Sequence, residues 1–511
     1  MDASGNAVSW FLDRHLAEGR GGATAFTDPA RSLTYAALAE ASARFAGSLR
    51  AAGVARESRL LMLMPDTVDF PVVFWGALRA GIVPVPVNTL LPPEQLAYML
   101  ADSRAAAVCA AASMLPALAP ALAATPPRLL LVAGEEDLPP GALSLEGFLA
   151  EGQPLAQPVP ASPDEVAFWL YSSGSTGAPK GVKHVHASLR ATAETYGAQV
   201  LGIRPDDLVY SAAKLFFAYG LGNAMTFPMA VGAASLLLPD RPTPAAVLDV
   251  MGRHSPSIFC GVPTLYAALL AQGELGRGAG SDRLRRCISA GEALPEQIGL
   301  RWREQTGCDI LDGIGSTEML HIFVSNRPEA IRYGTTGLAV PGYDLRIVDE
   351  AGREVADGEI GELLVRGPSA AEGYWNQRAK TRRTFEGEWT RTGDQYVREA
   401  DGFYRYQGRA DDMFKVSGIW VSPFAVEAAL MTHPAVQEAA VIGEEDADGL
   451  VKPKAFVVLK PDAAEDNLFD ALRDTAKSRA GPWAYPRWVE VLEELPKTAT
   501  GKIQRFKLRA S

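Results

Sequence analysis

Features that would mark a nucleic-acid-binding, disulfide-bonded or exported protein are scarce in this chain. Its 49 lysines and arginines are outnumbered by 60 aspartates and glutamates, a formal charge of −11, and no basic tract offsets the excess. A nucleic-acid partner is therefore disfavoured. The cysteines, Cys109, Cys260, Cys287 and Cys308, show no CxxC spacing, which favours reduced, buried thiols in a cytoplasmic protein. The first residues lack the basic and apolar regions of a signal peptide.

Long apolar runs suited to a membrane are also missing. The two uncharged stretches that come nearest are residues 105–127 and 215–239. Four prolines interrupt the first, and glycines and Pro228 interrupt the second, so neither suits a spanning helix. The second predicts a buried helix followed by a buried strand, and we expect no membrane partner.

The chain is long enough for more than one core, because 511 residues exceed one ordinary domain. Up to about residue 410, apolar strand-like runs alternate with helical stretches, as in residues 59–64, 70–81 and 83–87. This alternation is typical of an α/β fold with mostly parallel, helix-covered sheets. Short strands and turns between about 335 and 410 predict a small barrel-like subdomain. We predict an N-terminal domain over 1–410 and a small α+β C-terminal domain over 411–511.

The most informative segment is residues 171–181 (YSSGSTGAPKG). It places four serine and threonine residues and three glycines around Lys180, between a strand-like run and a predicted helix. Glycines let backbone N–H groups turn toward an anion, and the hydroxyls and the lysine add donors and charge. The segment predicts a phosphate site, although its spacing is not that of a P-loop; a flexible linker is the alternative. The residues assigned to the site are Ser172, Ser173, Gly174, Ser175, Thr176 and Lys180.

Three further segments carry candidate chemistry. Residues 312–318 (DGIGSTE) end in Glu318, whose carboxylate suits Mg²⁺; a turn with a solvated glutamate is the alternative. Residues 392–394 (TGD) are a polar turn when taken alone. Residues 496–505 (PKTATGKIQR) are basic and contain Lys502, and a solvated basic tail is the alternative.

Together and in this order, the four segments resemble the signatures of the adenylate-forming superfamily. That superfamily includes acyl- and aryl-CoA ligases, luciferases and peptide-synthetase adenylation domains. The resemblance covers residues 171–505. It implies that a carboxylate attacks the α-phosphate of ATP in the presence of Mg²⁺, and that the resulting acyl-adenylate passes its acyl group to a thiol, here that of CoA.

The resemblance also implies roles for individual residues. Glu318 binds Mg²⁺, and Thr317 donates to a phosphate. Asp394 and Arg409 bind the ribose hydroxyls. Lys502 contacts the acid and the α-phosphate, where a compact ammonium suits the developing charge. The other implied ATP-binding residues are Gly291, Glu292, Ala293, Asp312, Gly313, Ile314 and Gly315.

A mobile C-terminal domain is a further implication. The family turns this domain about a residue that matches Asp411, which withdraws Lys502 and brings residues 415–418 to the site. Lys415, Ser417 and Gly418 would then shape the CoA tunnel, and Lys415 would act in the thioester step. A solvated surface lysine is the alternative for Lys415.

Two short segments resemble benzoate-CoA ligases in particular. In residues 214–221, Phe217 stands where many relatives carry a histidine, and residues 319–322 (MLHI) follow Glu318 directly. Aromatic and branched walls suit a benzene ring. A core histidine is the alternative for His321. The predicted aryl-acid pocket consists of Phe217, Ala218, Tyr219, Gly315, Leu320, His321 and Ile322.

The sequence therefore predicts an AMP-forming aryl-CoA ligase for benzoate or a small ring-substituted benzoate such as 2-aminobenzoate. A stand-alone aryl-acid adenylation enzyme that loads a separate carrier protein is the alternative. Homodimer formation stays open.

Overall fold

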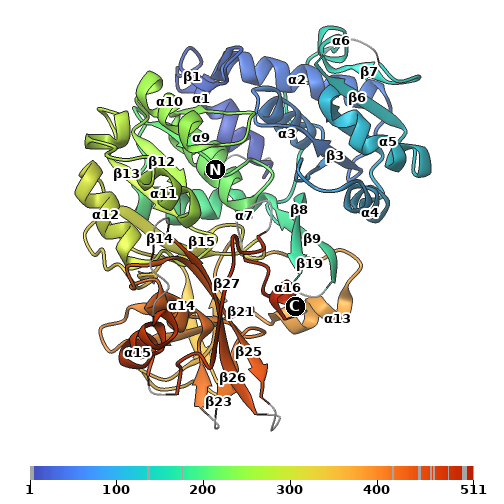
Figure 1. The fold of residues 1–511 in the computed structure, drawn as a ribbon. Coiled ribbons are helices and arrows are strands. Elements are labelled where there is room, and N and C mark those ends of the chain that lie inside the picture. Colours follow the sequence, from blue (N-terminus) through green and yellow to red (C-terminus); the bar gives the residue numbers. More distant parts are fainter. Residues whose placement is uncertain are drawn as a thin grey trace.

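Two mainly parallel sheets form the upper part of the molecule in Figure 1. The computed structural model describes residues 5–134, 138–174, 177–416, 419–446, 450–460, 463, 467–481, 483–497 and 503–509. The first sheet has the order β4 (Val83–Pro86), β3 (Arg59–Leu63), β5 (Ala107–Ala111), β6 (Leu129–Ala133) and β7 (Leu143–Ser144). Its strands pair in parallel, and β5 is buried along its whole length, as expected for a strand covered on both faces.

The second sheet has nine strands and supplies most of the site. From one edge to the other its order is β16 (Leu338–Ala339), β15 (Ile322–Ser325), β14 (Ile310–Gly315), β13 (Arg286–Ser289), β12 (Ile258–Gly261), β10 (Leu208–Ser211), β11 (Ala234–Leu236), β1 (Thr24–Thr27) and β2 (Ser32–Thr34). The strands from β14 to β1 are parallel, and the outer ones pair antiparallel. The carboxyl ends of β13 and β14 therefore open at one edge of the sheet, where open α/β sheets bind ligands.

Helices connect and cover these sheets. Their ends follow local preference: the Thr34 side chain caps α2 by accepting from Ala37 N, and Gly307, with φ of 72°, ends α12. Helix α3 is buried along almost its whole length, because apolar residues surround it on all sides. The helices are α1 (Arg14–Ala17), α2 (Tyr35–Ala51), α3 (Asp69–Arg79), α4 (Pro93–Ser103), α5 (Leu115–Ala124), α6 (Leu145–Ala150), α7 (His186–Thr192), α8 (Ala218–Leu221), α9 (Phe227–Val231), α10 (Pro244–His254), α11 (Pro263–Leu270) and α12 (Glu296–Thr306).

The predicted phosphate segment lies in a β-hairpin. Strands β8 (Val166–Gly174) and β9 (Gly177–Val185) pair antiparallel, with Ser172 opposite Lys180, and β19 (Gly373–Tyr374) joins the edge of β9. The expected order of strand, loop and helix is thus incomplete, because a second strand, β9, lies between the predicted loop and α7. Antiparallel pairing of the two flanks is the physical reason, since it satisfies their backbone groups before the helix begins.

The predicted barrel-like region and the C-terminal unit are both present, below the two sheets in Figure 1. The former is an antiparallel sheet of β17 (Asp344–Val348), β18 (Gly361–Arg366), β20 (Phe385–Glu386), β21 (Trp389–Arg398) and β22 (Tyr404–Arg409), with α13 (Arg378–Thr384) beside it. The latter comprises β23 (Phe414–Val416), β24 (Ile419–Val421), α14 (Pro423–Leu430), β25 (Val436–Glu445), β26 (Val451–Leu459), α15 (Leu468–Ala480), β27 (Trp488–Val491) and α16 (Arg505–Leu508).

The C-terminal unit has a hydrophobic core of its own. Val426 of α14 and Leu472 of α15 pack with Val441 of β25 and Val457 of β26. This confirms the predicted fold class: an α/β fold with parallel sheets, a barrel-like sheet and a separate small C-terminal domain. The exact boundary between residues 410 and 411 stays a prediction.

The expectations about the cysteines and about membrane-spanning helices can also be compared with the structure. All four cysteines are free and buried. Among the helices that the structure describes, none combines the length and the apolar character that a bilayer crossing needs.

Gly337 lies where the nine-stranded sheet meets the barrel-like sheet. Its carbonyl accepts from Tyr404 N at 2.8 Å, its φ is +101°, and a Cβ added there would lie 2.2 Å from Asn326 N. Gly337→Ala should therefore lower the free energy of unfolding by about 3 kcal/mol, because steric overlap adds to backbone strain. Urea unfolding followed by circular dichroism measures this loss.

Gly358→Ala is the matched control for backbone strain alone. Gly358 has φ of +88°, and a Cβ there would meet nothing within 4 Å, so the cost should be only about 1 kcal/mol. Equal losses in the two variants would contradict the close approach at Gly337.

Candidate active site

The β8–β9 hairpin brings Lys180 to a carboxylate from another sheet. Lys180 Nζ lies 3.6 Å from Glu318 Oε1 and 3.4 Å from Tyr374 Oη, and it is 4.5 Å from the centroid of the Tyr374 ring. Glu318 follows β14, and Tyr374 belongs to β19. Three distant segments of the chain thus converge on one cation.

The Glu318 carboxylate is the second centre of this cluster. It accepts from Tyr374 Oη at 2.8 Å and from Ser172 Oγ at 3.4 Å. The side chains of Lys180 and Glu318 are only 13% and 15% exposed. Burial lowers the pKa of Lys180, and the neighbouring Glu318 opposes that change. In such a partly dehydrated place, an ammonium attracts a phosphate more strongly than it would in bulk water.

Glu318 is the candidate metal ligand. Within the described ranges, no group of three or more His, Cys, Asp or Glu side chains could hold a metal ion. Mg²⁺ is usually held in nucleotide-dependent sites by one or two carboxylates, with phosphate and water oxygens completing its shell. Glu318, with the hydroxyl of Ser172 beside it, fits this hard cation if a nucleotide supplies the remaining oxygens.

The residues predicted to lie against the nucleotide base are at the carboxyl ends of β13 and β14. Asp312 Oδ2 accepts from Leu294 N at 3.4 Å, whereas the buried Oδ1 has no partner in the part of the chain that the structure describes. Burial raises the pKa of Asp312. Gly291, Glu292 and Ala293 lie in the bend that follows β13, the strand beside β14. An unpaired buried oxygen at this edge suits a donor from a ligand.

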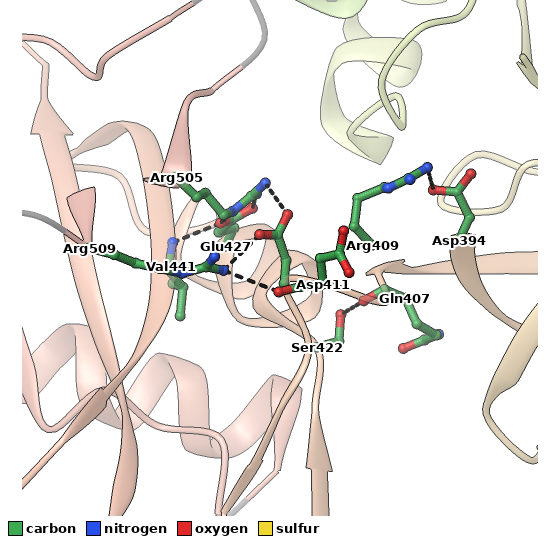
Figure 2. Close-up of polar contacts among 10 residues, drawn as sticks. Asp394, Gln407, Arg409, Asp411, Ser422, Glu427, Val441, Arg505 and Arg509 are labelled. Atoms are coloured by element: carbon green, nitrogen blue, oxygen red, sulfur yellow. Dashed lines mark hydrogen bonds and ion pairs between the residues drawn. The ribbon is translucent and has the colours of Figure 1, made fainter. Parts of the chain in front are cut away.

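Asp394 and Arg409 contact each other where the chain enters the C-terminal unit, as Figure 2 shows. Arg409 Nη1 donates to Asp394 Oδ1 at 3.1 Å. It also donates to the carbonyl of Thr392 at 3.1 Å. The Asp394 carboxylate raises the pKa of Arg409. Ala410 N donates to the carbonyl of Gly393 at 2.9 Å. The chain is thus fixed to β21 up to the residue before Asp411.

Beyond Asp411, Arg505 of α16 and Arg509, which follows this helix, hold the start of the C-terminal unit (Figure 2). Arg505 Nη2 donates to both carboxylate oxygens of Glu427 at 2.8 Å, and its Nη1 lies 3.5 Å from Asp412. Arg509 donates to Asp412 at 2.7 Å. Glu427 also accepts from Val441 N at 2.7 Å. These contacts tie the last described helix to the residue after Asp411.

Several predicted residues are not brought to the cluster. Lys415 Nζ lies 3.4 Å from Glu350, and the Lys415 side chain is 47% exposed, so it pairs with that surface carboxylate rather than with Glu318. Near the predicted Lys502, the described residues Lys497 and Ile503 pair with each other as an isolated β-bridge. The predicted residues outside the described ranges are Ser175, Thr176, Ser417, Gly418 and Lys502.

The predicted aryl pocket centres on His321. Its ring centroid lies 4.6 Å from that of Phe227, 5.1 Å from that of Tyr196 and 5.7 Å from that of Tyr219. Burial lowers the pKa of His321 to about 3, so the ring is neutral at ordinary pH. The His321 environment is therefore uncharged and largely aromatic, which suits an aryl ring.

Main-chain groups of neighbouring segments surround the other pocket residues. Tyr219 Oη donates to the carbonyls of Gly261 and Ile288 at 3.0 and 3.1 Å. A Cβ on Gly315 would lie 2.6 Å from the carbonyl of His321, and Leu320 has φ of +64°. Phe217 and Ala218, at the start of α8, are half-buried, and Ile322 begins β15.

Two π-helical segments complete the surroundings of His321. Tyr196 belongs to η3 (Ala193–Leu201), and Gly222 begins η4 (Gly222–Thr226). A Cβ on Gly222 would lie 2.4 Å from Cδ2 of His321. Such wider helical turns are often found at functional sites, and the missing side chain of Gly222 leaves room for the imidazole.

Comparison with known proteins agrees with this geometry. The AMP-binding enzyme family matches residues 13–375, and the AMP-binding enzyme C-terminal domain matches residues 425–502. The chain belongs to the AMP-binding enzyme family. This confirms the resemblance to adenylate-forming enzymes inferred from the sequence.

Individual relatives of this AMP-binding enzyme are similar over almost the whole chain. A 4-hydroxybenzoate–CoA/benzoate–CoA ligase of Rhodopseudomonas palustris is 55% identical over 99% of this chain and 94% of its own. A benzoate–CoA ligase of Thauera aromatica is 52% identical over 99% and 96%. Among solved structures, a benzoate CoA ligase from Burkholderia xenovorans has a TM-score of 0.91 at 49% identity, covering 99% of both chains. The anthranilate CoA ligase AuaEII in complex with anthranoyl-AMP has a TM-score of 0.94 at 41% identity, covering 100% of this chain and 98% of its own.

Sequence reasoning about this AMP-binding enzyme missed four residues of the site. Tyr374 contacts Lys180 and Glu318, His184 contacts the carbonyl of Thr317, and Tyr196 and Gly222 pack against His321. Tyr196 and Gly222 carry no local signal. His184 lies just beyond the glycine-rich segment, and this proximity was the one available hint.

Gly222→Ala should weaken binding in the aryl pocket. The added methyl group would overlap the His321 ring, and the ring must move to make room. We expect the affinity for benzoate to fall about 10-fold, equal to about 1.4 kcal/mol, while the affinity for Mg·ATP stays unchanged. Isothermal titration calorimetry measures both.

Gly252→Ala is the matched helical control, since a Cβ on Gly252 of α10 would meet nothing within 4 Å. It should leave both affinities unaltered. A Gly222→Ala protein that binds benzoate like the wild type would show that His321 does not line the acid site.

His321 should not titrate at ordinary pH. Its pKa of about 3 means that the ring gains a proton only as the pH falls toward that value. Affinity for benzoate should therefore show no inflection from His321 between about pH 5.5 and about pH 8.5, a range in which an unperturbed histidine changes charge. The measurement is a pH series of benzoate titrations on the wild type and on His321→Gln. An inflection near the ordinary histidine pKa that disappears in the variant would contradict a buried neutral ring.

Proposed function

We propose that this chain is an aryl-CoA ligase that joins benzoate, or a small ring-substituted benzoate such as 2-aminobenzoate, to CoA with the conversion of ATP to AMP and pyrophosphate. The relatives named above carry benzoate, hydroxybenzoate or anthranilate in their names, at up to 55% identity over 99% of this chain. The choice of ring substituent within this class is part of the proposal.

One observation supports the proposal above the others. Glu318, which contacts Lys180, and His321, which packs among Tyr196, Tyr219 and Phe227, are three residues apart in one turn. A phosphate site and an apolar ring site are therefore adjacent. A carboxylate on a ring held near His321 would face phosphates held near Lys180, and such positioning can supply much of the rate acceleration.

The chemistry requires charge to be neutralised at the phosphates. A carboxylate is a poor electrophile, and its attack on the α-phosphate of ATP yields an acyl-adenylate and pyrophosphate. Lys180 and the hydroxyl of Ser172 would bind the phosphates. When bound at Glu318, Mg²⁺ would supply further positive charge to the same oxygens. Asp394 and Arg409 would hold the ribose.

The second half-reaction needs a different set of residues. The thiol of CoA attacks the acyl carbon of the adenylate, and AMP leaves. We infer that a C-terminal domain beginning at residue 411 turns about Asp411 between the two steps, exchanging Lys502 for Lys415 and the neighbouring Ser417 and Gly418. The pairing of Lys415 with Glu350 at 3.4 Å is consistent with a loop turned away from the phosphates.

A CoA-thioester assay over a panel of acids tests this proposal. The panel contains benzoate, 2-aminobenzoate, 4-hydroxybenzoate, cyclohexanecarboxylate and hexanoate. We expect kcat/KM to be highest for benzoate or 2-aminobenzoate and at least about 100-fold lower for hexanoate, since a flexible chain loses the stacking contacts of a flat ring. Preference for hexanoate would refute the aryl assignment.

A further inference from the structure

We propose that His184 is a positioning residue for the phosphate site: it holds the main-chain carbonyl of Thr317 and so fixes the place of the Glu318 carboxylate. This inference rests on the proposed function, and it adds a residue to which neither the sequence motifs nor the comparisons give a role.

His184 reaches Thr317 through a well-defined contact. Its Nε2 lies 2.7 Å from the carbonyl oxygen of Thr317. Because a carbonyl can only accept, Nε2 must carry the proton and donate. The other ring nitrogen, Nδ1, is buried and has no partner among the residues described. The Thr317 contact is thus the one hydrogen bond that this ring makes there.

The surroundings of His184 hold its ring in one orientation. The ring stacks on Phe168 of β8 with centroids 5.2 Å apart and planes 19° apart, and no part of the residue is exposed. Burial lowers the pKa of His184 to about 4, so the ring is a neutral donor at working pH. The paired strands β8 and β9 therefore present a fixed N–H to the Thr317 carbonyl.

The segment that His184 holds has little regular structure of its own. Residues 316–321 form the turn between β14 and β15. The Thr317 carbonyl also accepts from Leu320 N at 3.2 Å, the Glu318 carbonyl accepts from Ala371 N at 2.9 Å, and Leu320 has φ of +64°. Such a strained turn depends on contacts from neighbouring elements to keep its shape.

Strand β9 holds this turn at two points. Lys180 and His184 are four residues apart in a stretch that pairs regularly with β8, so both side chains lie on one face of β9. Lys180 reaches the Glu318 carboxylate, and His184 reaches the main-chain carbonyl of Thr317. The strand that binds phosphate through Lys180 therefore also sets the distance from Lys180 to the carboxylate.

Two substitutions separate hydrogen bonding from packing. His184→Phe keeps a flat ring on Phe168 but removes the donor, whereas His184→Gln can place an amide N–H near the position of Nε2. We expect His184→Phe to weaken Mg·ATP binding about 10-fold, because Glu318 loses its fixed position, and to raise the Mg²⁺ concentration needed for adenylation. His184→Gln should recover most of both.

His15→Phe is the matched control. His15 is also fully buried, and its Nε2 contacts the carbonyl of Met229 at 2.5 Å, but it belongs to the N-terminal helix α1. It should lower the melting temperature about as much as His184→Phe does, without a change in Mg·ATP affinity.

The readouts are calorimetric titration of Mg·ATP without acid, and the rate of thioester formation from supplied benzoyl-AMP and CoA. If His184 has the positioning role, His184→Phe should bind Mg·ATP more weakly than the wild type. Its rate of thioester formation from benzoyl-AMP and CoA should stay within about 2-fold of the wild-type rate. Unchanged Mg·ATP affinity in folded His184→Phe, or equal loss of both readouts with no recovery in His184→Gln, would overturn it. If the phenylalanine variant does not fold, His184→Asn, whose amide is too short to reach the carbonyl, takes its place.

Failure of the proposed function would give a different pattern. In that case the wild type would bind Mg·ATP but would form no thioester from any aromatic acid, whatever the behaviour of the His184 variants.

Discussion

The site depends on one interaction, the partly buried contact of Lys180 with Glu318 under the ring and hydroxyl of Tyr374. Buried ion pairs seldom increase stability, because dehydration of both charges offsets their attraction. This pair has a Nζ–Oε1 distance of 3.6 Å, longer than an ideal ion pair, and side chains 13% and 15% exposed. Such a loose pair is better suited to ligands: a phosphate can take the ammonium and a cation can take the carboxylate. Strands β9, β14 and β19 come from three regions of the chain, and their packing serves to hold this contact in place.

The same turn joins two environments of opposite character. Glu318 lies among charges and hydroxyls, whereas His321, three residues later, is neutral and surrounded by Tyr196, Tyr219 and Phe227. An aromatic carboxylate has the same division, an apolar ring and an anionic end. In the proposed reaction, that anion would attack a phosphate held at the boundary between the two environments. With both environments on one turn, recognition of the ring would be coupled to the position of the reacting carboxylate.

Much of the fold and of the candidate site could be predicted from the sequence, because the informative residues lie in a few contiguous segments. The alternation of strands and helices gave the fold class, and residues 171–181 and 312–322 contain most of the site. Tyr374, His184, Tyr196 and Gly222 were missed because their contacts arise only when distant segments pack. The hairpin that separates the glycine-rich turn from α7 was also missed, since a strand of nine residues with polar and glycine positions looks like a loop. Residue roles carried by the resemblance, such as those of Asp411 and Lys502, stay predictions.

The central claim is that a mixed anhydride of an aromatic acid and AMP forms before CoA reacts. Exchange of labelled pyrophosphate into ATP, measured with benzoate and Mg²⁺ but without CoA, tests it most directly. The account predicts exchange that requires the aromatic acid and stops when the metal is chelated, because adenylation is reversible while pyrophosphate is present. Thioester formation by an enzyme that shows no acid-dependent exchange in the absence of CoA would contradict it.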